Sequence, residues 1–261
     1  MSTNLYIRPF ISLFLLCATL SVFASEIYVY PSPSGKKSTK AAHLFILSGQ
    51  SNMSFFNAKD YFAPSIKEIY GEESVIIVKD AKGGQSIQRW YKDWKSAQGN
   101  ESKYKGDLYD RLMSNVKPAI EGREIKTITF IWMQGESDAA HNQVVGVYKE
   151  SLKGLFKQLE TDLGRTDINY IIGRVSDYTL EPGKNYQKHP QWQALRDIQV
   201  NFAKEHPRAT WVNCDDLNNI TDKATGIPFN GVHYTQEGYE TLGKRYVEKA
   251  VQMIEKFFNI K

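Results

Sequence analysis

The sequence is poor in cysteine, with two, Cys17 and Cys214, among 261 residues. Cys17 lies in an N-terminal segment that we expect to be removed, so no disulfide can form within the mature chain. The charge is nearly balanced, with 33 basic and 29 acidic residues. This excess is too small and too dispersed to predict a nucleic-acid partner. With 41% hydrophobic and 24% charged residues, the composition excludes a disordered chain and predicts a globular one.

Long hydrophobic runs are absent after the first 25 residues, so we expect no membrane span in the mature chain. Residues 1–24 carry one charge, Arg8, and an apolar run from Phe10 to Leu20, and they end on the small residues Val22 and Ala24. This pattern is typical of a secretory signal peptide cleaved after Ala24, and it predicts a secreted or periplasmic protein. An uncleaved anchor is the alternative, but the run is short for a span.

Several motifs that mark cofactor chemistry are missing from the sequence. There is no His-Glu-x-x-His, no paired-cysteine motif, no Walker loop and no dinucleotide-binding glycine fingerprint. The Gly-x-Ser-x-Gly elbow of α/β-hydrolases is absent as well. The sequence therefore predicts neither a metal nor an organic cofactor.

The chain instead alternates short β-rich runs with longer stretches of helical periodicity. The runs are almost continuously apolar, which is typical of strands buried on both faces of a parallel sheet. We expect strands at 43–48, 75–79, 126–133, 168–173 and 210–213. We expect helices at 108–121, 144–163, 192–205 and 235–258, the last with Thr235 as its N-cap. This order predicts a three-layer α/β/α sandwich over residues 42–261, after a spacer at 25–41.

Polar residues follow these strands at the edge of the sheet where the site of a parallel α/β protein forms. Ser51 lies in a Gly-Gln-Ser-Asn-Met motif at 49–53, where a strand-to-helix turn would lift its hydroxyl above the sheet. Gly84 follows the second expected strand, and Gln134 and Glu136 follow the third. Taken alone, each has a plainer interpretation as a helix cap, a turn or a loop residue.

His233 precedes the last expected helix and is the histidine best placed for the same edge. Of the other four histidines, two are expected to be structural or exposed and two lie in loops that could line a site: His43 and His206, then His141 and His189. A serine, oxyanion donors and a histidine at one edge are the set that nucleophilic acyl transfer requires. In that chemistry the histidine takes the proton of the serine hydroxyl.

In their order along the chain, these motifs resemble the SGNH hydrolases, and within them the sialate O-acetylesterase and carbohydrate esterase family six group. The shared pieces are the motif at 49–53, Gly-Gly-Gln-Ser-Ile at 83–87 with Trp90, the segment Trp-Met-Gln-Gly-Glu-Ser-Asp at 132–138, and Gly-Val-His at 231–233. The resemblance covers residues 43 to about 250. It implies a flavodoxin-like, five-stranded parallel sheet and metal-free removal of acetyl groups from sugars.

The resemblance also implies a role for each matching residue. Ser51 would be the nucleophile and His233 the base. The backbone N–H groups of Ser51 and Gly84, with the side chain of Gln134, would form the oxyanion hole. Further residues of these motifs are predicted to bind the substrate: Gln50, Asn52, Gln85 and Trp90.

Two positions depart from the family pattern. Asn230 stands where the family usually has an aspartate, three residues before the histidine, and Met133 stands where a histidine often precedes Gln-Gly-Glu. Asparagine cannot stabilise an imidazolium by charge. In part of the family the glutamate of Gln-Gly-Glu takes this role, so the resemblance implies that Glu136 is the acid that orients His233. A serine–histidine dyad and three carboxylates in the loop before His233 are the alternatives: Asp215, Asp216 and Asp222.

The sequence leaves two substrate classes open, sialic acid and acetylated xylan or a similar plant polysaccharide. Trp90, Tyr91 and Trp94 could stack on sugar rings or belong to the core, and for Trp94 we expect exposure. Lys82 and Arg89 could pair with a sialic acid carboxylate or be solvated charges. The alternatives to a carbohydrate O-acetylesterase are a lipid or aryl esterase of the same fold and a sugar-binding protein that has lost turnover.

Overall fold

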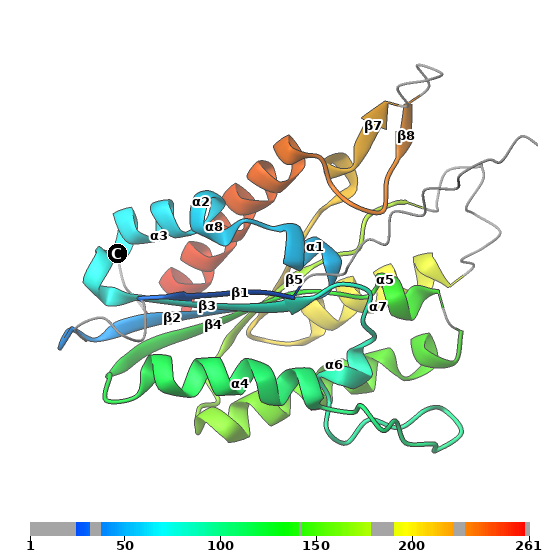
Figure 1. Cartoon of the computed structure of the whole chain (residues 1–261), viewed down its shortest axis with the longest axis horizontal. Helices are drawn as coiled ribbons and strands as arrows, with labels where there is room; N and C mark the ends of the chain where they lie inside the picture. The colour runs from blue at the N-terminus through cyan, green and yellow to red at the C-terminus, as the bar shows by residue number, and fades with distance from the viewer. Residues whose placement is uncertain (1–24, 32–37, 141, 179–190, 222–227, 259–261) are drawn as a thin grey trace, which may run out of the picture.

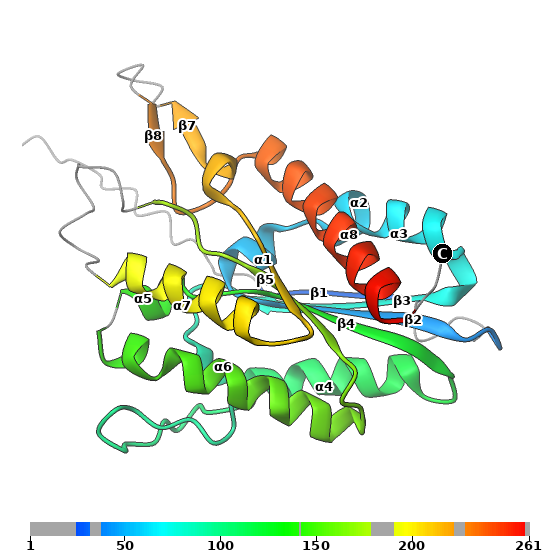
Figure 2. The same ribbon diagram turned by 180° about the vertical axis from the view of Figure 1, so that it is seen from behind.

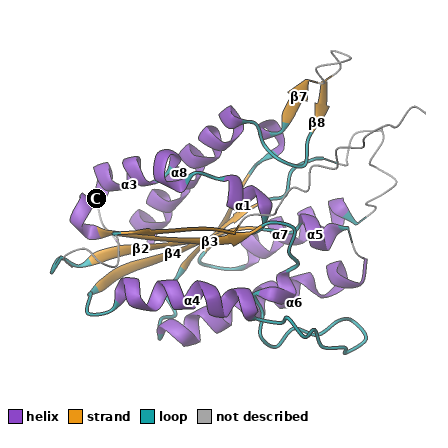
Figure 3. Ribbon diagram, viewed as in Figure 1, coloured by secondary structure: helices purple, strands orange, loops and turns teal. Residues whose placement is uncertain are grey.

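The computed structural model describes residues 25–31, 38–140, 142–178, 191–221 and 228–258. A central sheet has helices on both faces, so the chain forms the expected three-layer α/β/α sandwich (Figure 3). Within the described ranges, no helix is both long enough and apolar enough to cross a membrane.

Five parallel strands form most of the sheet, and all five lie where the sequence predicts strands. They are β2 (Ala42–Gly49), β3 (Val75–Lys82), β4 (Ile125–Met133), β5 (Asn169–Gly173) and β6 (Ala209–Val212). Their spatial order is β3-β2-β4-β5-β6, which is the flavodoxin order. The order of the strands reverses between β2 and β4. Ligands of such sheets bind beyond the carboxyl ends of the strands at this switch point.

A sixth strand, β1 (Ser25–Tyr30), pairs antiparallel with the outer edge of β3. The prediction of a spacer over 25–41 is therefore wrong for these six residues, and the sheet has one strand more than the five predicted. The signal was an alternating pattern: Val29 packs against one core, while Tyr28 and Tyr30 pack against the other. The Ser, Pro and Gly residues after Tyr30 are typical of a spacer, and for this reason the strand pattern before them was not recognised. β1 covers an edge of β3 that would otherwise be open.

In the described part of the chain, seven helices cover the two faces, and the four long ones begin and end within two residues of their predicted ends (Figure 1). One face carries α4 (Asp107–Ile120), α6 (Asn142–Leu163) and α7 (Trp192–Glu205), and the other carries α1 (Ser51–Phe55), α2 (Ala58–Tyr61), α3 (Ala63–Tyr70) and α8 (Gln236–Phe258), as Figure 2 shows from behind. Thr235 caps α8 as predicted, because its hydroxyl accepts a hydrogen bond from the N–H of Gly238 at 2.9 Å.

Each face of the sheet has its own apolar core. In β2, Leu44 and Ile46 pack into the core under α4 and α6, while Phe45 and Leu47 pack into the core under α3 and α8. Both faces of the strand are buried, as its continuous apolar run predicts. A short antiparallel pair, β7 (Asn219–Thr221) with β8 (Pro228–Asn230), leads to the segment that holds His233.

Candidate active site

The loops after β2 and β4 meet in direct backbone contact at the switch point. Gly49 and Gly135 both have a φ of 147°, which L side chains rarely adopt. A Cβ on Gly49 would lie 1.9 Å from the carbonyl oxygen of Met133. The N–H of Gln50 donates to that same oxygen at 2.9 Å. This contact places the start of α1 beside the start of the short helix α5 (Glu136–Ala139).

Ser51 is the first residue of α1, so its hydroxyl and its N–H lie together at the carboxyl end of β2. The N–H groups of the first turn of a helix have no acceptor within the helix, and they are suited to a developing negative charge. The other end of α1 is held from below by Lys79, which is fully buried. Its ammonium donates to the carbonyl oxygens of Ser54, at 3.0 Å, and of Phe56. Gly84 follows β3 in an exposed turn with a φ of 68°.

Asn52 joins three parts of the site through its side chain. Its amide nitrogen donates to Glu136 Oε1 at 2.6 Å and to the carbonyl oxygen of Val232 at 3.0 Å. Its amide oxygen accepts a hydrogen bond from the Tyr239 hydroxyl at 3.0 Å. The side chain has no exposed surface. Asn52 is therefore an internal link between α1, α5 and the residue before His233, and its contact with the substrate stays a prediction.

Glu136 is a buried carboxylate with one of its two oxygens unpaired. Oε1 accepts from Asn52, and Oε2 has no hydrogen-bond partner. Burial raises the pKa of Glu136 to about 7, and the nearby charge of Asp138 adds to the shift. Glu136 is linked to the histidine segment through Asn52 and Val232, and its role as the acid stays a prediction.

Gln134 and Asp138 connect the loop after β4 to the loop after β3. The fully buried Gln134 amide nitrogen donates to the Asp138 carboxylate, to the Gln85 carbonyl oxygen at 3.0 Å and to Gln50 Oε1 at 3.2 Å. Asp138 also accepts from the Ser86 hydroxyl at 2.8 Å. The two hydrogens of the Gln134 amide are thus shared among internal acceptors, and its role as an oxyanion donor stays a prediction. Sequence reasoning assigned no role to Asp138, although it ends the Gln-Gly-Glu-Ser-Asp segment.

His233 is half-buried and packs edge-on against Phe55, with ring centroids 5.0 Å apart and an interplanar angle of 84°. Burial lowers its pKa, so the ring is neutral at neutral pH, as a general base requires. Among the described residues, no hydrogen bond joins this ring to Ser51 or to a carboxylate. Apo sites often lack such bonds, which tighten when the substrate arrives.

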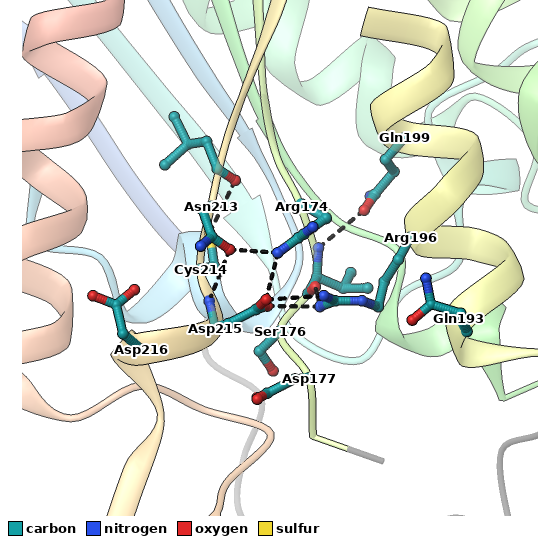
Figure 4. A network of polar contacts seen from close by, with 12 residues as sticks. Arg174, Ser176, Asp177, Gln193, Arg196, Gln199, Asn213, Cys214, Asp215 and Asp216 are labelled. Atoms are coloured by element: carbon teal, nitrogen blue, oxygen red, sulfur yellow. Dashed lines mark hydrogen bonds and ion pairs between the residues drawn. The ribbon is translucent and has the colours of Figure 1, made fainter. Parts of the chain in front are cut away.

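Two of the alternative acids are engaged by arginines. Asp215 accepts from Arg196 at 2.8 and 3.0 Å and from Arg174, and Figure 4 shows this network between the ends of β5, β6 and α7. Asp216 accepts from Arg245 at 2.7 and 2.6 Å. Their charges are therefore already balanced by guanidinium groups.

Two further positions bear on which residue is the acid that orients His233, namely Asp222 and Asn230. Asp222 is outside the described residues. Asn230 is the last residue of β8 and pairs with Asn219. Among the described residues, no group of three or more His, Cys, Asp or Glu side chains could hold a metal ion.

The predicted aromatic contacts belong to the core. Trp90 is 1% exposed and donates from Nε1 to the Ser48 hydroxyl at 3.0 Å, and Trp94 is 6% exposed. The prediction that Trp94 is exposed is wrong. Trp90 is a core residue, and its contact with the substrate stays a prediction. Arg89 is paired with Asp107 at 2.9 Å, which indicates a structural role.

The other histidines are distributed as follows. His43 is buried, with Nδ1 2.8 Å from the Thr127 hydroxyl oxygen, and His206 stacks on Phe202, so both are structural as expected. His141 and His189 lie outside the described residues.

Comparison with known proteins agrees with this geometry. The family described as "Carbohydrate esterase, sialic acid-specific acetylesterase" matches residues 55–252, a segment that includes Gly84, Gln134, Glu136 and His233. No curated protein matches the chain.

Solved structures share the fold. A carbohydrate acetylesterase from Xanthomonas citri superposes with a TM-score of 0.60 at 16% identity, over 81% of this chain and 56% of that one. A protein from Arabidopsis thaliana superposes with a TM-score of 0.56 at 17% sequence identity, over 82% of this chain and 99% of that one. A GDSL-like protein from Parabacteroides merdae superposes with a TM-score of 0.54 at 13% sequence identity, over 83% of this chain and 99% of that one. At these identities, the structural likeness establishes the fold alone.

The resemblance seen in the sequence is confirmed by the family match and by these folds. The chain belongs to the carbohydrate esterase family described as sialic acid-specific acetylesterase, and it is therefore an ester hydrolase; its fold is that of GDSL-like and carbohydrate acetylesterase structures.

Proposed function

We propose that the protein is a secreted carbohydrate O-acetylesterase with Ser51 as the nucleophile and His233 as the general base. One observation carries the proposal. At the switch point, the side chain of Asn52, the residue after Ser51, is hydrogen-bonded to the carbonyl oxygen of Val232, the residue before His233. Nucleophile and base are thereby held on neighbouring segments although they are far apart in the sequence.

The reaction has two steps. His233 takes the proton of the Ser51 hydroxyl as its oxygen attacks the acetyl carbonyl carbon, and the protonated ring then gives that proton to the departing sugar oxygen. In the second step His233 takes a proton from water, the water oxygen attacks the acetyl-serine, and acetate leaves as Ser51 regains its proton. The N–H groups of Ser51 and Gly84 stabilise the negative oxygen in both steps.

Glu136 acts in this proposal as a positioning residue. An ionised carboxylate strengthens the 2.6 Å hydrogen bond from Asn52, and the other hydrogen of the same amide holds Val232 in place. The carboxylate thus fixes the backbone that carries His233, without touching the ring. Asn230 can then replace the usual aspartate without loss of the site.

The substrate we propose first is an O-acetylated sialic acid, as the description of the matching family suggests. Arg89 is paired with Asp107, so Lys82, half-buried at the end of β3, is the better candidate to meet the sialic acid carboxylate. Secretion is part of the proposal: cleavage after Ala24 would leave Ser25, the first residue of β1, at the new N-terminus.

Substitution of the nucleophile tests the proposal. Ser51→Ala should reduce acetate release from an acetylated sugar by about a millionfold, because the attacking oxygen is gone. Circular dichroism should be unchanged, since alanine fits the first turn of a helix. Ser65→Ala, an exposed serine in α3, is the matched control and should retain full activity. Activity of the Ser51→Ala protein above about one per cent of wild type would show that another residue is the nucleophile.

A further inference from the structure

Phe55 is an exposed aromatic residue in an otherwise buried helix. It ends α1, whose other residues, 51–54, are all buried, yet 54% of Phe55 is exposed. The next residue, Phe56, is fully buried against Tyr246. The chain could therefore bury an aromatic ring at this point, and it places one ring in the core and one at the surface. An exposed ring costs hydrophobic stabilisation, so its position invites a functional explanation.

The position of Phe55 relative to the proposed machinery is specific. It follows Ser51 by four residues, so the two side chains lie one turn apart on the same side of α1. Its ring meets the His233 ring edge to face at 5.0 Å. In the described part of the chain, this is the one ring contact that Phe55 makes. The proposed nucleophile Ser51, the proposed base His233 and the exposed ring of Phe55 are therefore neighbours.

We propose that Phe55 is the platform on which the sugar ring of the substrate stacks while its acetyl ester lies between Ser51 and His233. This inference rests on the proposed function. One face of a pyranose is lined with C–H groups, which carry partial positive charge and fit the negative face of an aromatic ring. A flat platform also orients the ring, which brings the ester to the nucleophile in a reactive geometry. Trp90 and Trp94, the aromatic residues that the sequence favoured for this task, are buried.

The test compares two substrates that differ in the group the platform would hold. One is a mono-O-acetylated sugar, and the other is ethyl acetate, which has no ring. Phe55→Ala should raise KM for the sugar and lower its kcat/KM by about tenfold, the usual value of a good aromatic contact. The kcat/KM for ethyl acetate should change less than twofold. Phe55→Tyr should behave as wild type, whereas Phe55→Leu, apolar but not flat, should behave as Phe55→Ala.

Ile69→Ala is the matched control, because Ile69 is an apolar side chain of similar exposure, 50%, that lines a pocket beside His43 at the amino end of β2. It should leave both substrates unaffected. Thermal denaturation of all variants checks that each is folded, and loss of the Phe55 ring should change the midpoint little because it is mostly in solvent.

Three results would overturn the inference. Equal loss on both substrates, with a shifted pH profile, would mean that Phe55 only packs His233 in place. Loss confined to an aryl ester such as 4-nitrophenyl acetate, with the sugar unaffected, would mean that the platform serves an aromatic leaving group. Unchanged kinetics on every substrate would mean that it serves none. If the wild-type protein releases no acetate from any acetylated sugar, the proposed function itself fails, and that outcome is separate from all three.

Discussion

A single buried carboxylate determines much of the chemistry expected of this site. Glu136 is 5% exposed, with one oxygen bound to Asn52 and the other without a partner. A protein that needed stability alone would gain by replacing it with a neutral group. Its retention at the switch point is typical of functional carboxylates, which are held in costly environments for the sake of the reaction.

Glu136→Gln should lower kcat roughly 10- to 100-fold, because a neutral amide holds Asn52, and through it the His233 segment, less firmly. The wild-type kcat should fall as the pH drops through about 7, where Glu136 becomes protonated. In the variant only the decline caused by protonation of His233, whose pKa is lowered by burial, should remain, at lower pH. Steady-state kinetics between pH 5 and 9 measure both. Asp216→Asn is the control, since Asp216 is bound to Arg245, and should leave kcat unchanged. Normal turnover of a folded Glu136→Gln protein would show that Glu136 does not position His233.

The same substitution should raise stability in alkaline solution. The pKa of Glu136 is about 7 in the folded protein against an ordinary 4.5, so between these values the folded state holds a proton that the unfolded state has lost. Stability therefore falls as the pH rises through this window, and above pH 7 the cost reaches about 3 kcal/mol. Urea denaturation at pH 4, 6 and 8 should find Glu136→Gln more stable than wild type at pH 8 and similar at pH 4. An equal difference at all three would contradict this explanation.

Individual residues were the least predictable part of the site from sequence alone. The motifs identified Ser51, Glu136 and His233 as candidates, but they did not tell which polar residues face inward. Asn52 and Trp90 belong to the shared motifs, and both proved to be buried. A pattern of residue types records that a position matters, whereas burial depends on neighbours from other segments. Phe55 carries no motif, and its exposure is visible only in the structure.

The long helices and the strands of the parallel sheet can be predicted from the pattern of apolar residues within each segment. Helices α4, α6, α7 and α8 each have an apolar face with a period of 3.6, and the strands of the parallel sheet have continuous apolar runs, so both kinds were predicted closely. Helices α2 and α3 have four and eight residues and were not predicted, and α1, of five residues, was expected only as the start of a helix after the turn at Ser51. Short helices are marginal on their own. Here α1 is held by tertiary contacts, among them the buried ammonium of Lys79 at its last carbonyls.

The turn between β2 and α1 should tolerate no side chain at Gly49. A Cβ there would overlap the backbone of Met133, which cannot move without separating β2 from β4. Gly49→Ala should therefore lower the free energy of unfolding by about 3 kcal/mol or more. Gly146→Ala is the contrasting variant, because this glycine lies inside α6 with nothing within 4 Å of a Cβ. It should gain about 0.5 to 1 kcal/mol. Urea denaturation of both proteins measures the two changes in the free energy of unfolding. If both substitutions stabilise the protein, or both destabilise it, the explanation is wrong.

At the scale of the whole molecule, the strand order explains why residues from four loops meet. Beyond the switch point between β2 and β4, the loops after β2, β3 and β4 and the segment before α8 come together and are joined by hydrogen bonds. This arrangement follows from the alternation of strands and helices, so the edge of the site was predictable. β1 was not predictable on the same grounds, because an antiparallel edge strand belongs to no such alternation.

Removal of β1 tests whether that strand is part of the fold or an addition to it. Val75, Ile76, Ile77 and Val78 of β3 are fully buried and β-branched, and without β1 their backbone would form an open edge that invites pairing with another chain. A protein that begins at Ser38 should therefore unfold at a lower temperature than one that begins at Ser25, and it should form aggregates in size-exclusion chromatography. Gly84 follows β3, but β3 keeps its parallel pairing with β2 up to Ala81 when β1 is absent, so the kcat on ethyl acetate, measured on the monomer fraction, should stay within about threefold of the longer protein. A monomer of unchanged thermal midpoint would show that β1 is dispensable, and the predicted spacer would then describe its energetic role correctly.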